Sequence, residues 1–104
     1  MGTIIPFVLQ YPNFSGSDSW GTILDFSLSG VQLKSYFSFF PQQKVVMSFF
    51  IRDRYEFKNV EGHIIWVKQE GDYFYAGIEF ASSLPKEKVA QAMHYMIDPN
   101  YHSN

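Results

Sequence analysis

Apolar and polar residues alternate in short runs over the first 80 residues of the chain, which is the pattern of β-strands. The clearest run is 44–51, where Val45, Met47, Phe49 and Ile51 fall at every second position and so share one face. Turn-forming residues separate the runs at close spacing, so the pattern predicts an all-β domain, a small barrel or sandwich. The strands are expected over 3–10, 20–25, 31–35, 44–51, 55–68 and 73–80.

Two residues inside these runs predict departures from regular pairing. Pro6 has no N–H to donate to a sheet, so the first strand is expected to be an edge or irregular strand. Gly62 lies within the long fifth run, where a glycine often marks a β-bulge or a close approach of two backbones. The connections predicted on composition are a loop at 12–19, a hairpin tip at 52–54 and a turn at 70–72.

The hydrophobic period changes from two to that of a helix after residue 80. The segment 82–85, Ser-Ser-Leu-Pro, is typical of a helix start, and Pro99 predicts the end of the helix. The apolar stripe expected to pack on the barrel consists of Val89, Met93, Met96 and Ile97. The length of 104 residues fits one domain, expected over 1–98, followed by a frayed tail at 99–104.

Composition and charge narrow the function classes. Eleven Phe and seven Tyr supply ample core area and leave some aromatic surface exposed. The formal net charge of −2 and the lack of a basic stripe argue against DNA or RNA as partners. The same facts disfavour a rival interpretation, an OB-like barrel that stacks aromatic side chains on single-stranded nucleic acid.

Several other site classes are not indicated by the sequence. The chain has no cysteine, and His63, His94 and His102 lack metal-ligand spacing, so no metal site is expected. No nucleophile elbow or oxyanion turn is present, so we expect no enzyme activity. No run approaches the roughly 20 apolar residues of a membrane helix, and no signal peptide is evident, so a cytoplasmic protein without membrane insertion is expected.

The segment Asp25-Phe-Ser27-Leu-Ser-Gly30 joins two apolar runs by a polar turn. Asp and Ser side chains can accept hydrogen bonds from backbone N–H groups of such a turn, and a glycine can adopt a positive φ at its end. Taken alone, the segment predicts a strand-to-strand connection.

The spacing Asp-x-Ser-x-x-Gly resembles the second signature motif of the PilZ family, the bacterial receptors for cyclic di-GMP. Two later segments agree with that family in order and spacing, Gly62-His-Ile-Ile-Trp66 and Gly77-Ile-Glu-Phe80, and a helix follows them. The resemblance covers about residues 20–97. It implies a six-stranded antiparallel β-barrel with a C-terminal α-helix and a regulatory role in cyclic di-GMP signalling.

The resemblance also implies a site. By carry-over, Asp25, Ser27 and Gly30 would contact the guanine of cyclic di-GMP, the one ligand expected; no cofactor is implied. Ligand-binding members also carry an Arg-x-x-x-Arg segment before the first strand, which holds the phosphates, whereas residues 1–33 here contain no Lys or Arg. Two interpretations remain open: the arginines belong to a preceding segment of a longer protein, or this is a degenerate PilZ domain that acts as a protein-interaction module without nucleotide.

An aromatic segment follows the third predicted strand and includes Tyr36, Phe37, Phe39 and Phe40. Two or three of these rings can cap the end of the barrel. The alternative is an exposed apolar surface for a protein partner or a second copy of the chain.

Overall fold

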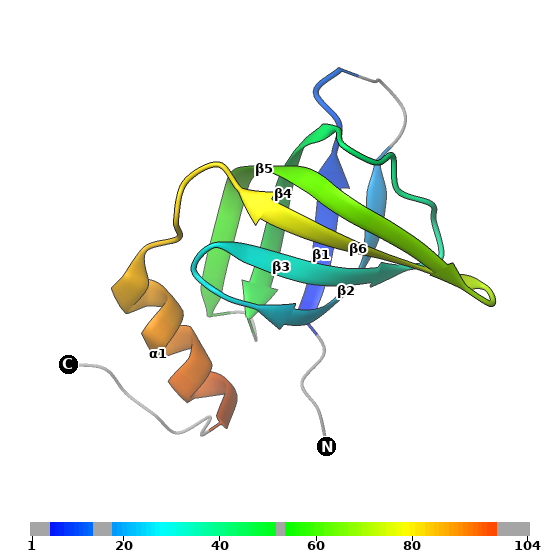
Figure 1. Cartoon of the computed structure of the whole chain (residues 1–104). Coiled ribbons are helices and arrows are strands. Elements are labelled where there is room, and N and C mark those ends of the chain that lie inside the picture. Colours follow the sequence, from blue (N-terminus) through cyan, green and yellow to red (C-terminus); the bar gives the residue numbers. More distant parts are fainter. Residues whose placement is uncertain (1–4, 14–17, 52–53, 98–104) are drawn as a thin grey trace.

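A computed structural model describes residues 5–13, 18–51 and 54–97, with the side chains of the last two residues excepted. Within these residues, six antiparallel strands close into one barrel in the order β1-β2-β3-β6-β5-β4, and one helix lies beside one end of it (Figure 1). The elements are β1 (Ile5–Gln10), β2 (Ser19–Phe26), β3 (Gly30–Ser35), β4 (Lys44–Ile51), β5 (Tyr55–Glu70), β6 (Tyr73–Phe80) and α1 (Lys86–Ile97). The expected six-stranded barrel with a C-terminal helix is confirmed.

The interior of the barrel is filled by the alternate apolar side chains of its strands. In β4 the predicted face is confirmed, because its four apolar residues at every second position are all buried. Burial of this kind is the main favourable term in folding. The largest fully buried side chains are Phe7, Leu9, Leu33, Val45, Met47, Phe49, Ile51 and Ile64.

The prediction that Pro6 makes β1 an edge or irregular strand was wrong, because β1 is paired on both sides without a register shift. β1 pairs with β2 on one side and with β4 on the other, so it is an interior strand of the closed barrel. The proline is tolerated because the β4 ladder begins only at the next residue, where Phe7 lies opposite Phe49. Pro6 itself is paired with Thr22 of β2.

The long strand β5 is irregular on both sides of Gly62 and not at the glycine itself. Its register with β4 shifts between Met47 and Phe49, and its register with β6 shifts between Ile64 and Trp66. Gly62 is paired in register, but a Cβ built on it would lie 2.6 Å from the Glu79 carbonyl oxygen. The glycine therefore marks a close approach of two backbones.

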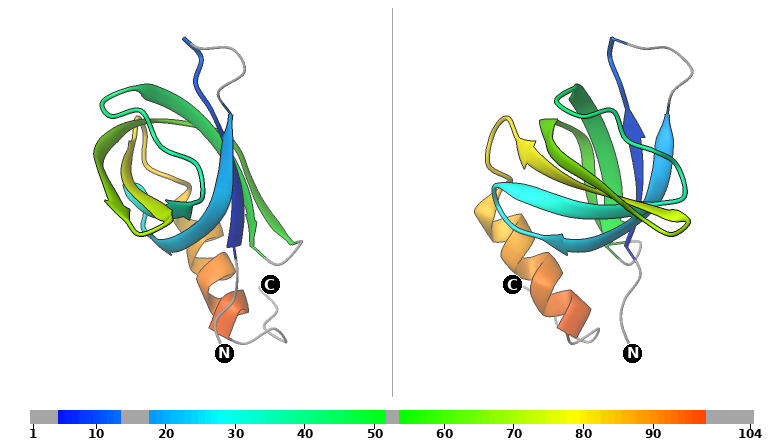
Figure 2. Two further views of the ribbon diagram at one scale, coloured as in Figure 1. Left: turned by 90° about the vertical axis from the view of Figure 1, so that its right-hand side faces the viewer. Right: turned by 45° about the vertical axis from the view of Figure 1, so that its right-hand side comes forward.

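The helix α1 begins directly after Pro85 and packs beside the β4–β5 hairpin (Figure 2). Val89 and Ala92 are buried, and the Tyr95 ring lies 5.7 Å from the Tyr55 ring. Met93 is 46% exposed, so its placement in the buried stripe was wrong. The buried face is centred on the i and i+3 positions, which leaves Met93 on its flank.

Several predictions lie partly or wholly outside the described residues: the start of the strand at 3–10, the middle of the loop at 12–19, and the Met96 and Ile97 side chains of the helix stripe are not described. Two more concern the 52–54 hairpin tip, of which only Arg54 is described, and the C-terminal tail from residue 99. Among the described residues, no helix has the length and hydrophobicity needed to cross a membrane.

Candidate functional site

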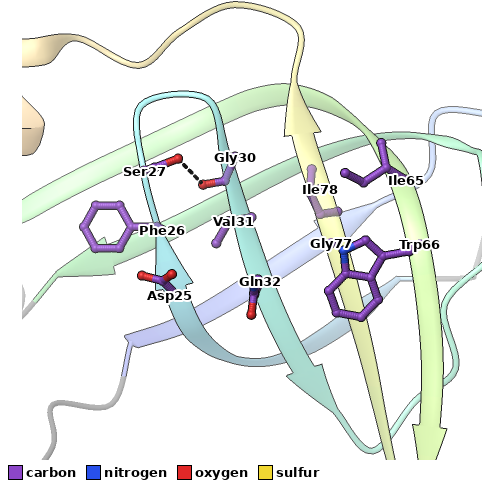
Figure 3. Close-up of a pocket in the computed structure, with 10 residues that line it drawn as sticks. All are labelled: Asp25, Phe26, Ser27, Gly30, Val31, Gln32, Ile65, Trp66, Gly77 and Ile78. Carbon is purple, nitrogen blue, oxygen red and sulfur yellow. Dashed lines mark hydrogen bonds between the residues drawn. The ribbon is translucent and has the colours of Figure 1, made fainter.

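The polar turn between β2 and β3 is closed by two hydrogen bonds of Ser27, one donated and one accepted. Its N–H donates to the Gly30 carbonyl at 2.9 Å, and its Oγ accepts from the Ser29 N–H at 3.3 Å. The same hydroxyl lies 3.5 Å from the Gly30 carbonyl oxygen (Figure 3). The serine of the motif therefore holds the turn while remaining exposed to solvent.

The outer side of the turn is bonded to the segment that leads into α1. The Phe80 N–H donates to the Ser29 carbonyl at 2.8 Å, and the Leu84 N–H donates to the Leu28 carbonyl at 2.9 Å. The Leu84 side chain is buried, and Leu28 packs against the same core. The turn and the start of the helical segment are thus joined by backbone hydrogen bonds.

Gly30 is required at this turn for a different reason from the one expected. The backbone at Gly30 does not have a positive φ; among the described glycines, Gly71 alone does. A Cβ built on Gly30 would overlap the Ile78 carbonyl oxygen of the neighbouring strand. The glycine allows β3 and β6 to approach closely where β3 begins.

A surface pocket of about 190 Å³ lies beside the turn and crosses four strands (Figure 3). Its middle is one row of cross-strand partners: Asp25 pairs with Gln32, Gln32 with Gly77, and Gly77 with Trp66. The row runs from β2 through β3 and β6 to β5. The remaining lining residues are Phe26, Ser27, Gly30, Val31, Ile65 and Ile78.

The gap left by Gly77 in this row is filled by Trp66. A Cβ built on Gly77 would overlap the indole of Trp66 at Nε1 and the two carbons bonded to it. The indole therefore lies against bare backbone, a known way for an aromatic side chain to compensate for a glycine in a sheet. It forms one wall of the pocket, opposite Asp25 (Figure 3).

The pocket contains hydrogen-bonding and aromatic groups but no cation among its described lining residues. The carboxylate of Asp25 can accept hydrogen bonds, the amide of Gln32 can donate and accept, and the Trp66 indole offers a flat face. Lys34 lies on β3, but its ammonium sits 4.0 Å from the centre of the Tyr73 ring, at a separate pocket. This chemistry suits a flat, neutral, hydrogen-bonding group and not a phosphate.

The aromatic segment after β3 divides into a buried part and an exposed part. Phe39 is buried, and its ring lies 6.4 Å from that of Phe7. Phe40 is partly exposed; its ring lies edge-on to that of Tyr11 at 5.1 Å, and its N–H donates to the Tyr11 hydroxyl at 3.2 Å. Burial raises the pKa of Tyr11 above its usual value of 10.0.

The other two rings of this segment stay on the surface against aromatic neighbours. The centre of the Phe37 ring lies 4.3 Å from the centre of the exposed Trp20 ring. Tyr36 is 68% exposed, and its hydroxyl lies 3.1 Å from that of Tyr73, an interaction that raises the pKa of Tyr36. One side of this segment therefore caps the barrel, and the other presents aromatic surface.

The motif residues meet at the pocket, but two of its walls were not predicted. Asp25, Ser27 and Gly30 all line it. The sequence indicates Gln32 only as an outward-facing strand residue, and it indicates Trp66 and Gly77 only as parts of the two later family segments. Within the described ranges, no group of three or more His, Asp or Glu side chains is placed to hold a metal ion.

Two comparisons with known proteins bear on identity. No curated protein matches the chain. The family model for the PilZ domain matches residues 6–97, which covers the barrel almost from its first strand and all of the helix. The closed barrel and the helix after it agree with that match, and the chain belongs to the PilZ domain family.

Proposed function

We propose that this chain is a regulatory binding domain of cyclic di-GMP signalling in which only the base-facing half of the nucleotide site is present. Membership of the PilZ family supports a regulatory domain of the cyclic di-GMP-binding type. The observation that carries the finer proposal is the pocket itself, with polar and aromatic walls and no cation among its described lining residues.

The base-facing half is supported by the groups around the motif. A guanine edge offers both hydrogen-bond donors and acceptors, which the Asp25 carboxylate and the Gln32 amide can match. The Trp66 indole provides a face on which a base can stack. Gly30 lines the same pocket, but its missing side chain makes room for the Ile78 carbonyl of β6, so its role in the proposed site is to hold the turn against that strand.

The phosphate-facing half is what the chain lacks. Cyclic di-GMP carries two phosphodiester charges, which are best held by the bidentate forks of arginine. The first cation in the sequence is Lys34, which lies over a tyrosine ring at another pocket. The only charged group among the described lining residues is Asp25, whose carboxylate repels a phosphate. We therefore expect this chain alone to bind the nucleotide more weakly than micromolar.

Calorimetric titration with cyclic di-GMP tests this proposal. The chain is compared with a version carrying an Arg-x-x-x-Arg segment fused ahead of Met1, and with the same fusion bearing Asp25→Ala. We expect no measurable heat from the chain, binding by the fusion, and loss of that binding with Asp25→Ala. Micromolar or tighter binding by the unfused chain would overturn the proposal that the phosphate-facing half is missing. A fusion that gives no heat of binding would overturn the proposal that the base-facing half is present.

A second candidate function is a protein-interaction domain that works without nucleotide, favoured by the exposed part of the aromatic segment. Because Phe39 is buried, the surface available to a partner comprises Tyr36, Phe37 and Phe40, next to Trp20. Aromatic side chains are enriched in the energetic centres of interfaces.

The exposed aromatic surface can be tested with paired serine variants. Phe37→Ser is compared with Leu24→Ser, since both residues are exposed and Leu24 lies elsewhere on β2. A partner captured by the parent chain should be lost with Phe37→Ser and kept with Leu24→Ser. Equal capture by both variants would exclude this surface.

A further inference from the structure

The last six residues of β5 have a sheet partner on one side only. β5 pairs with β6 down to Glu70, but its ladder with β4 ends where His63 lies opposite Lys44. The next residue, Ile64, is bonded through its backbone to Gln42 and Gln43, and no described residue pairs with that side of 65–70. Figures 1 and 2 show the β5–β6 hairpin projecting from the barrel wall.

The free edge is exposed on both faces and is unusually apolar. All six residues are exposed, and Ile65, Trp66 and Val67 expose 54%, 39% and 39% of their surface. Alternate residues also turn an unpaired N–H and C=O outward, as on any sheet edge. Exposed edges are normally blunted by charge, proline or short length, and three consecutive apolar residues do the opposite. A two-stranded ribbon of this kind gains stability from a further strand.

We propose that this edge pairs in antiparallel fashion with the same edge of a second copy of the chain. The two-fold axis would pass through Val67, so that Val67 faces Val67 of the second copy. In that register Trp66 faces Lys68 of the second copy, and Ile65 faces its Gln69. The alignment uses the free segment from Ile65 to Gln69 and gives each outward backbone group a partner.

The charge pattern of the segment favours a second copy as the occupant. With the axis at Val67, no two like charges lie opposite each other, and each Lys68 meets an indole, which attracts an ammonium group. With the axis at Lys68, two lysines would face each other, which is destabilising. Glu70, which pairs with Lys68 at 3.2 Å within one chain, lies at the end of the segment in the favoured register. An interface in which each copy presents the same patch is the usual form of a two-fold dimer.

The interface is small, so the dimer is expected to be reversible. Five strand residues per copy bury much less than the roughly 1,600 Å² of a standard stable complex. We therefore expect an association that depends on protein concentration and is invisible in dilute solution. Ile65 and Trp66 also line the pocket, but the proposal rests on the strand edge and does not require the nucleotide.

Single cysteines give a direct test, because the chain has none of its own. Val67→Cys is compared with Val8→Cys, since both valines are exposed on strands and Val8 lies on β1, paired on both sides. Facing residues of paired strands have Cα atoms about 4.5–5.5 Å apart, within disulfide range. Under mild oxidation we expect Val67→Cys to form a disulfide-linked dimer at least ten times faster than Val8→Cys. Equal rates, or no dimer from either variant, would overturn the proposal.

Sedimentation of the cysteine-free chain provides the second measurement. The parent and Val8→Lys should show the same concentration-dependent shift toward a dimer, and Val67→Lys should remain a monomer. A parent that stays monomeric at several hundred micromolar would overturn the second copy as the occupant of this edge. Loss of the dimer with Val8→Lys and not with Val67→Lys would place self-association on β1 and overturn it as well.

Discussion

The indole of Trp66 covers the backbone of Gly77, its cross-strand partner, and takes the space in which any side chain at position 77 would lie. The two residues are eleven positions apart in the sequence and belong to two different family segments. Their spatial relationship explains why both occur: the glycine makes room, and the tryptophan fills that room and forms a wall of the pocket.

Gly77→Ala is therefore expected to displace the indole. The added methyl group overlaps the ring, so we expect a loss of about 1–3 kcal/mol in the free energy of unfolding. In a Trp20→Phe background, the Trp66 fluorescence should shift to the red as the ring moves into water. The matched control is Gly71→Ala, where the added methyl group meets no atom within 4 Å and only the positive φ of 58° opposes it. That variant should lose about 1 kcal/mol without a spectral shift.

The two parts of the aromatic segment should respond differently to truncation. Phe39→Ala removes a buried ring and should cost about 3–5 kcal/mol, measured by urea unfolding. Phe37→Ala removes an exposed ring that lies against the exposed Trp20 ring, and we expect a loss of about 1 kcal/mol or less. Similar losses for both variants would contradict the division of the segment into buried and exposed parts.

The raised pKa of Tyr11 leads us to expect a loss of stability at alkaline pH. Because burial raises its pKa above 10.0, the folded chain keeps the phenol proton to a higher pH than the unfolded chain does. The free energy of unfolding should therefore fall as the pH rises from 10 toward the folded pKa.

Tyr11→Phe separates this effect from other alkaline titrations. At pH 8 the variant should be less stable by about 0.5–1.5 kcal/mol, because the Phe40 N–H loses its acceptor. Above pH 10 the difference between the parent and the variant should narrow. Urea unfolding at pH 8, 9, 10 and 11 provides the measurement, and a constant difference would contradict the raised pKa.

Two of the motif residues, Gly30 and Asp25, should separate into a structural and a ligand-facing role. Gly30→Ala forces a methyl group into the Ile78 carbonyl and should cost about 1–3 kcal/mol, because β3 and β6 must move apart. Asp25→Ala changes an exposed side chain and should alter the free energy of unfolding by no more than about 0.5 kcal/mol. A strongly destabilised Asp25→Ala variant would show that the aspartate is retained for stability.

The alternation of side chains in β4 predicted the buried face correctly, because a strand with one face in the core leaves no other choice for its apolar residues. The prediction from Pro6 was wrong because it depends on long-range pairing and not on a local pattern. The effect of Pro6 depends on where the ladder with β4 begins, and the first pair of that ladder joins Phe7 to Phe49, more than forty residues away. The prediction for Met93 was wrong because adjacent positions on a helix, here Ala92 and Met93, differ by about 100° in direction. Only the packing of the helix decides which of the two is buried.

The site was predicted in part for similar reasons. The Asp-x-Ser-x-x-Gly spacing is local, and the turn that it predicts is present. The row from Asp25 through Gln32 to Gly77 and Trp66 is set by the registers of three strand pairs. No local pattern contains those registers, so the shape of the pocket could only be seen once the barrel was closed.

The hydrogen bonds from Phe80 and Leu84 to the turn carbonyls connect the polar turn to the base of α1. Leu84 is two residues from the first residue of α1, so a ligand or partner that shifts the backbone of Leu28 and Ser29 also pulls on the base of the helix. A shift of the turn need not cross the barrel to reach α1, because the two backbone hydrogen bonds connect them directly. On the proposed function, a ligand that binds at the polar turn is therefore expected to change the orientation of α1.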